Sequence, residues 1–169
     1  MVLSQPLVVG IVTPTARQWA EAAPDLADAQ FLLGLFGDMS ALGDGPAPLD
    51  CFRRAIALDP THQAALRELV YRVTAWNEYA QHELPCGYLG TSPITEDIDD
   101  LREVTALLPA IVDRDWVAGI APRLEELLAT AIAWQAFRAA KAEDFARWCL
   151  DHGTDNRFAG RARLQPDGS

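Results

Sequence analysis

The side chains best suited to chemistry lie in one short stretch of the chain. Tyr71, Glu78, His82 and Cys86 offer a phenol, a carboxylate, an imidazole and a thiol. Glu78 and His82 are four residues apart, so on a helix they share a face and could form an ion pair or bind a metal. Cys86 follows closely and could act as a nucleophile with His82 as its base. These four residues define one candidate function, that of a small helical enzyme or ligand-binding bundle.

The same stretch lacks other groups that such chemistry needs. A zinc helix of the HExxH type requires a second histidine, but Cys86 stands at that position and Pro85 would break the helix. No sequence feature indicates an oxyanion site for a thiol nucleophile. The acidic run over 96–100 lacks the calcium-loop spacing and its glycine, and is more typical of a helix start. We therefore expect a solvated ion pair of Glu78 and His82, with no catalytic residue, metal or cofactor.

The length, amino-acid composition and net charge are those of a globular, acidic chain. Of its 169 residues, 50% are hydrophobic and 22% are charged, which is enough apolar material for one domain with its own core. A formal net charge of -10 repels phosphate backbones, so we expect no nucleic-acid partner, and a basic protein is the natural complement. Lysine occurs once, at Lys141, against thirteen arginines, a bias that we associate with a bacterial source.

The cysteines and the first apolar run bear on location. Cys51, Cys86 and Cys149 are odd in number and widely spaced, so they predict neither a disulfide framework nor a zinc site. The apolar run over 6–12 is too short to cross a bilayer, and no basic residue precedes it. We therefore expect a cytoplasmic protein without a membrane segment.

Two helices are predicted before the reactive stretch. Apolar residues recur at three- and four-residue steps over 29–42, which indicates a helix. Gly34 inside it costs about 1 kcal/mol against alanine, so we expect a close-packed neighbouring helix there. The chain breaks at 43–46, Pro48 begins a second helix, and Asp59-Pro60 ends it.

A third helix carries most of the reactive side chains. Thr61 is expected to cap it, and it extends over 63–83 with Trp76 on its inner side. Elsewhere, Thr13-Pro14 is a good start for a short helix, and Pro122 is expected to begin the longest helix.

The fold class is therefore all-α, with six or seven helices in one domain over 1–153. The helix over 29–42 and the helix that Pro48 begins form a predicted helical hairpin. We expect an N-terminal arm with a short helix (1–24), the hairpin and the third helix (25–83), a loop (84–95), C-terminal helices (96–153) and a flexible tail (154–169).

The hairpin resembles a known repeat. Leu33-Gly34 in the first helix, then Phe52, Ala55 and Asp59-Pro60 in and after the second, resemble a tetratricopeptide repeat. The resemblance covers about one and a half repeats, residues 28–75. The pattern departs from the family in a longer turn between the helices and in its loss after the third helix has begun. Because about three repeats are needed to bury a continuous core, the other helices must complete it.

The resemblance implies a groove that holds a segment of another protein. The partner-binding positions that it implies are Phe31, Leu35, Asp38, Arg67, Tyr71 and Thr74. Their mixed, largely apolar character favours an apolar or amphipathic segment over a chain-end carboxylate. The resemblance thus implies a non-catalytic protein–protein interaction module, an adaptor or chaperone-like protein.

Other interpretations stay open beside it. Phe31 and Leu35 could instead be buried by the chain's own segments. The acidity would also suit an immunity or inhibitor protein that masks a basic toxin. A homodimer would cover the apolar end that a truncated repeat array leaves.

Overall fold

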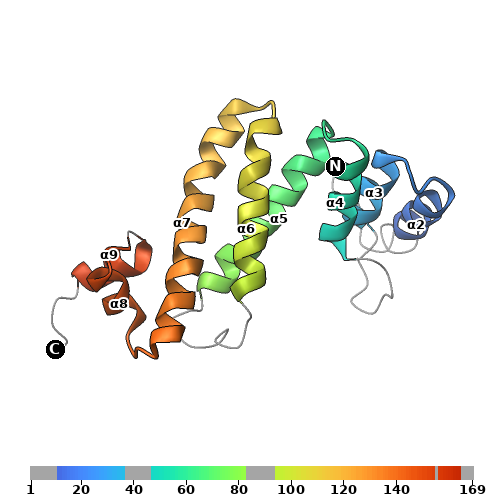
Figure 1. Ribbon diagram of the computed structural model, residues 1–169. Helices are drawn as coiled ribbons and strands as arrows, with labels where there is room; N and C mark the ends of the chain where they lie inside the picture. Colours follow the sequence, from blue (N-terminus) through green and yellow to red (C-terminus); the bar gives the residue numbers. More distant parts are fainter. Residues whose placement is uncertain (1–10, 37–46, 83–93, 155, 165–169) are drawn as a thin grey trace. The chain divides into compact units, whose positions relative to one another are not determined.

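The computed structural model describes residues 11–36, 47–82, 94–154 and 156–164, and this part of the chain is all-α, without a strand. It contains eight α-helices, labelled as in Figure 1. They are α2 (Thr13–Ala22), α3 (Ala27–Phe36), α4 (Pro48–Leu58), α5 (Gln63–His82), α6 (Ile94–Leu107), α7 (Arg114–Ala140), α8 (Phe145–Asp151) and α9 (Arg157–Leu164), with a 3-10 turn over Leu108–Ala110. The predicted fold class is confirmed.

The chain divides into two compact units where the sequence predicts one domain. Unit 1 comprises residues 1–72 and 109–112, and unit 2 comprises residues 73–108 and 113–169. Helix α5 therefore contributes its first half to unit 1 and its second half to unit 2.

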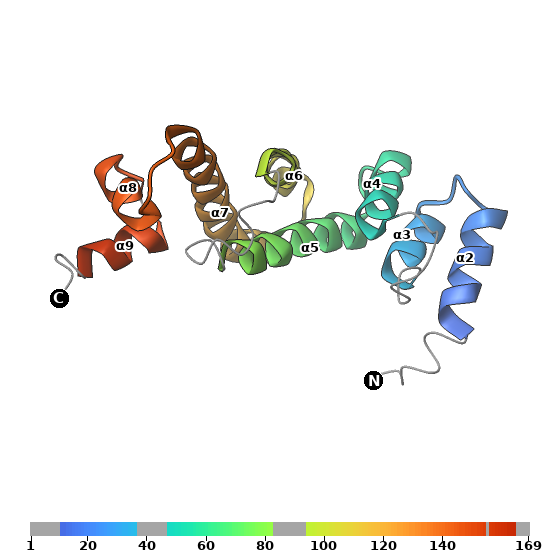
Figure 2. The same ribbon diagram turned by 90° about the horizontal axis from the view of Figure 1, so that it is seen from below.

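In unit 1, α3 lies between α2 and α4 (Figures 1 and 2). Contacts between α3 and α4 run in opposite order along the two helices. Asp28, at the start of α3, pairs with His62, beyond the end of α4, at 3.0 Å, whereas Gly34 near the end of α3 meets Cys51 in the first half of α4. The two helices are therefore antiparallel neighbours, as the sequence predicts.

Gly34 is the point of closest approach in this hairpin. A Cβ atom added at Gly34 would lie 2.6 Å from Cε1 of Phe52 and 3.1 Å from Cβ of Cys51, both well inside van der Waals contact. The close-packed neighbour that the sequence requires is therefore present. Pro48 opens α4 at its first turn, and α4 ends at Leu58, just before Asp59-Pro60, as predicted.

The start of α2 differs in detail from its prediction. The helix begins at Thr13, but the Thr13 hydroxyl does not cap it. Instead Thr13 Oγ1 donates a hydrogen bond of 2.7 Å to the carbonyl of Phe36, at the end of α3. The threonine thus satisfies one of the carbonyls that a helix end leaves without an intrahelical partner.

In unit 2, α6 and α7 pack along each other (Figure 1). Helix α7 runs unbroken through Pro122, where the sequence predicts the start of a helix. Proline leaves the carbonyl four residues earlier without its helical donor. Here Pro122, Ala118 and Gly119 are all exposed, so water can reach that carbonyl and the helix tolerates the proline. Asp113 caps the true start by accepting from the Trp116 N–H.

Residues 157–164 form helix α9 where the sequence predicts a flexible tail from residue 154. In α9, Phe158 and Ala159 are buried in a cluster with Trp134, Phe145 and other residues of α7 and α8. The Asn156 side chain caps α9 by accepting from the Phe158 and Ala159 N–H groups at 3.1 and 3.0 Å. The prediction is therefore wrong for residues 157–164, because an apolar contact and a cap order them.

Candidate partner-binding surface

Helix α5 has one buried and one exposed side over its whole length. Its buried residues recur at three- and four-residue steps: Ala65, Leu66, Leu69, Val70, Val73, Thr74, Asn77, Ala80 and Gln81. Three large aromatic residues lie outside that stripe and are more than half exposed, namely Tyr71 in unit 1 and Trp76 and Tyr79 in unit 2.

Trp76 and Tyr79 form an exposed ring contact, which we call the Trp76–Tyr79 pair. The two side chains are 54% and 58% exposed, and their ring centroids are 6.2 Å apart. They are three positions apart in the sequence, so they lie on adjacent turns of the same side of α5. Together they present one continuous aromatic surface.

The part of α5 beneath the pair is held firmly within unit 2. Buried Gln81 donates from Nε2 to the carbonyl of Leu127 in α7 at 2.7 Å. Glu78 of α5 forms an ion pair with Arg123, which also belongs to α7. A buried hydrogen bond and an ion pair thus fix the helix, and the aromatic rings extend from a preorganised support.

Sequence reasoning places Trp76 on the inner side of α5, and the structure corrects this. Trp76 follows buried Leu69 by seven residues, about two helical turns, and is nevertheless 54% exposed. Leu69 belongs to unit 1 and Trp76 to unit 2, so each residue has different packing neighbours. The helical spacing alone does not distinguish the two positions.

Of the predicted groove residues, two are half-buried packing residues. The Phe31 ring lies 5.9 Å from that of Phe52 and 5.1 Å from that of His62, so it fills the space between α3, α4 and the start of α5. Leu35 is likewise half-buried. Phe31 therefore packs within unit 1, as the alternative interpretation expects for this residue.

The remaining groove residues differ among themselves. Arg67 and Tyr71 are exposed, and they are four residues apart on one side of α5. Thr74 is only 2% exposed, so its side chain has no surface to offer a partner, and we correct the prediction for this residue. Asp38 lies outside the described residues.

Two of the four residues proposed for chemistry, Glu78 and Tyr71, have described side chains. The carboxylate of Glu78 pairs with Arg123 of α7. Tyr71 is exposed two turns earlier on α5. His82 ends α5, and its side chain lies outside the described part, as does Cys86. Among the described residues, no group of three metal-ligating side chains could hold an ion.

The two described thiols are poor nucleophiles. Burial raises the pKa of Cys51, and the neighbouring charge of Asp50 raises it further. Burial also raises the pKa of Cys149, against a smaller lowering by its hydrogen bond from Asn156. Both thiols are therefore protonated at neutral pH and shielded from reagents.

Within the described ranges, the helices include none that is both long and apolar enough to cross a membrane. Comparison with known proteins found no matching family model, no matching curated protein and no matching solved structure. The resemblance of the α3–α4 hairpin to a tetratricopeptide repeat stays a prediction.

Proposed function

We propose that this protein is a non-catalytic protein-interaction module in which the Trp76–Tyr79 pair anchors an apolar or amphipathic segment of another protein. The observation that carries the proposal is the contact between two aromatic rings that are each more than half exposed. Trp and Tyr are enriched among the residues that contribute most to protein–protein affinity. An aromatic surface of this kind gains free energy when a partner removes it from water.

The setting of the pair supports the same conclusion. Glu78, between the two aromatic residues in sequence, is already paired with Arg123, so its charge is compensated without a partner. The indole N–H and the phenol can satisfy polar groups at the edge of an otherwise apolar contact. An apolar or amphipathic segment therefore fits the pair better than a strongly charged one.

The test is a binding comparison between two variants of the full chain. W76S/Y79S removes both rings, and I132S removes an exposed aliphatic side chain of α7 that is 43% exposed. Wild type and I132S should capture the same stoichiometric protein from the source cells, and W76S/Y79S should not. With the captured protein purified, W76S/Y79S should weaken the Kd at least about 30-fold, the loss typical of a hot spot. Equal affinity of W76S/Y79S and wild type, with both folded by circular dichroism, would refute the proposal.

A third variant separates this surface from the groove that the sequence predicts. Y71S removes the exposed tyrosine of unit 1 and leaves the Trp76–Tyr79 pair unchanged. We expect Y71S to reduce the affinity for the partner by less than W76S/Y79S does. If Y71S abolished binding and W76S/Y79S had no effect, the predicted groove would be the binding site instead.

A further inference from the structure

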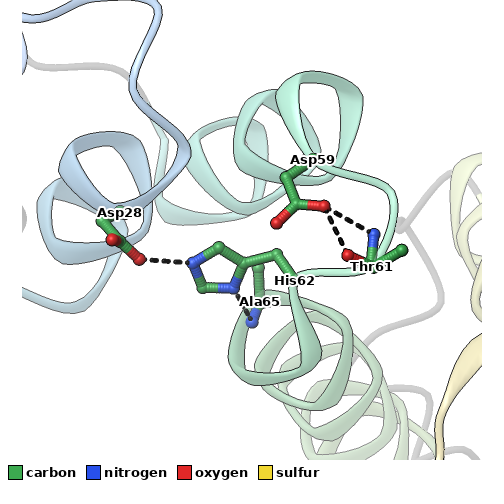
Figure 3. Close-up of polar contacts among 5 residues, drawn as sticks. All are labelled: Asp28, Asp59, Thr61, His62 and Ala65. Atoms are coloured by element: carbon green, nitrogen blue, oxygen red, sulfur yellow. Dashed lines mark hydrogen bonds and ion pairs between the residues drawn. The ribbon is translucent and has the colours of Figure 1, made fainter.

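His62 immediately precedes α5, and both nitrogens of its ring are engaged (Figure 3). Nδ1 accepts a hydrogen bond of 3.1 Å from the backbone N–H of Ala65, in the first turn of α5. Nε2 lies 3.0 Å from Oδ1 of Asp28 in α3. The sequence predicts Thr61 as the cap of this helix. Thr61 instead donates both its N–H and its hydroxyl to Asp59.

The two partners of His62 determine where its proton is. A backbone N–H can only donate, so Nδ1 must carry a lone pair. An ionised carboxylate can only accept, so Nε2 must carry the hydrogen. The neutral Nε2–H form of the imidazole satisfies both contacts, and neither nitrogen remains available as a general base. His62 is therefore a structural cap that also links α3 to the start of α5.

We propose that His62 is a proton-operated cap, which releases the first turn of α5 when the ring takes up a second proton. The second proton must bind at Nδ1, where it replaces the lone pair that accepts from Ala65. The Ala65 N–H then loses its acceptor and faces another N–H group. The positive ring also lies at a helix start, where the helix dipole disfavours positive charge.

Two carboxylates determine where the protonated ring goes. Asp28 faces it from α3, and Asp59 faces it from the turn that follows α4 (Figure 3). The hydrogen bonds from Thr61, followed by a smaller effect of His62, lower the pKa of Asp59, so this carboxylate stays ionised in mild acid. Both carboxylates attract the imidazolium, so the ring keeps its contact with Asp28 and gives up the cap.

The chain provides internal references for this behaviour. Asp113 caps α7 by accepting from Trp116, and Asp144 caps α8 by accepting from the Arg147 N–H. The caps of α7 and α8 contain no imidazole, so a second proton on His62 leaves their acceptors unchanged. Protonation of His62 should therefore open the cap of α5 and leave those of α7 and α8 closed.

Amide hydrogen exchange, followed by NMR on the full chain at pH 8 and pH 5, tests this. After correction for the intrinsic pH dependence of exchange, the protection of the Ala65 amide should fall about fivefold at pH 5, the loss that corresponds to one helix cap. The protection of Trp116 and Arg147 should stay constant. In H62N, whose amide oxygen can cap but does not titrate, Ala65 should keep its protection at both pH values.

A second measurement is made on the wild type alone, and so it does not depend on the folding of a variant. The ring 15N shifts of His62 should show a hydrogen on Nε2 and a bare Nδ1 at pH 8, with hydrogen on both nitrogens at pH 5. A hydrogen on Nδ1 at pH 8 would overturn the proposal. So would an Ala65 protection that stays constant while the ring becomes protonated.

Discussion

The α3–α4 hairpin of unit 1 and the α7–α9 cluster of unit 2 are stabilised in opposite ways. The hairpin brings two backbones close together at Gly34, and only the absence of a side chain there leaves room for Phe52. The cluster fills its space with large rings: Phe145 lies 4.9 Å from Trp134 and 5.3 Å from Phe158, measured between centroids. The hairpin should therefore be sensitive to added volume, whereas the cluster should be sensitive to removed volume.

The largest effect should come from F158A. Phe158 is buried against Phe145 and is the main apolar contact of α9, so its loss leaves a cavity and releases the helix. We expect the free energy of unfolding of unit 2 to fall by about 3–5 kcal/mol, as for other buried phenylalanines. Urea unfolding followed by circular dichroism measures this change.

The matched control for F158A is R157A, on the same short helix. Arg157 is exposed, and its guanidinium carbon lies 4.9 Å from the centre of the Phe158 ring. Loss of this cation–π contact should cost no more than about 1 kcal/mol. If F158A cost as little as R157A, α9 would not be part of the cluster, and the prediction of a flexible tail would be correct after all.

The next largest effect should come from G34A. The added methyl group would overlap the ring of Phe52, which is fully buried. Overpacking should lower the free energy of unfolding by about 1–3 kcal/mol. The better helix propensity of alanine should offset up to about 1 kcal/mol of this loss. Thermal unfolding measured by calorimetry should show this as a lower Tm for unit 1.

Gly119 gives the same substitution in an open setting. It lies inside α7 with nothing within 4 Å of an added Cβ. G119A should therefore stabilise the protein by about 0.5–1 kcal/mol through helix propensity alone. Substitutions of the same kind are thus expected to have opposite signs, and the same sign for both would contradict the close approach of α3 and α4.

The two buried thiols show which unit each substitution affects. Cys51 lies in the hairpin and Cys149 in the cluster, and both react with a thiol reagent only when their surroundings open. In a C86S background, G34A should accelerate the labelling of Cys51 more than that of Cys149, and F158A should do the reverse. Equal acceleration of both thiols would mean that the two regions unfold as one.

A smaller effect is expected at Trp134, where the aromatic cluster contains an unsatisfied polar group. In the described part of the chain, the Trp134 indole N–H is buried without a hydrogen-bond partner. W134F removes this donor and also some packed volume, and the two consequences oppose each other. We therefore expect a net change within about 1 kcal/mol, against the 3–5 kcal/mol that a buried ring usually costs when it is lost. A much larger loss in urea unfolding would show that the N–H has an acceptor.

The hairpin could be predicted well from sequence because its determinants are local. Gly34 signals the close approach, Pro48 marks a helix start, and Asp59-Pro60 marks a helix end. The two prolines act through the conformational limits of their own backbone and that of the preceding residue, and Gly34 acts through its missing side chain. Such signals are visible without knowledge of the tertiary structure.

The candidate surface and the cluster could be predicted less well because they depend on distant contacts. The polar residues around Phe158 suggest a disordered tail, and only the rings of α7 and α8 make its burial favourable. Trp76 has a large apolar side chain of the kind that is usually buried, but it lies at the surface. His62 takes the capping role expected of Thr61, because Asp59 already accepts both donors of that threonine.

The smallest expected effect concerns one histidine in each unit and the ring nitrogen that carries its hydrogen. His152 follows α8 in unit 2, stacked on Trp148 at 4.1 Å between ring centroids, and its Nδ1 lies 2.9 Å from the Trp148 carbonyl. A carbonyl only accepts, so His152 carries its hydrogen on Nδ1, the reverse of His62. A second proton then binds at Nε2 and breaks no contact, while the helix end and the indole face both favour the positive charge. The ring 15N shifts at pH 8 should therefore report opposite neutral forms, with the hydrogen on Nδ1 in His152 and on Nε2 in His62. The same neutral ring form at both histidines would remove the contrast.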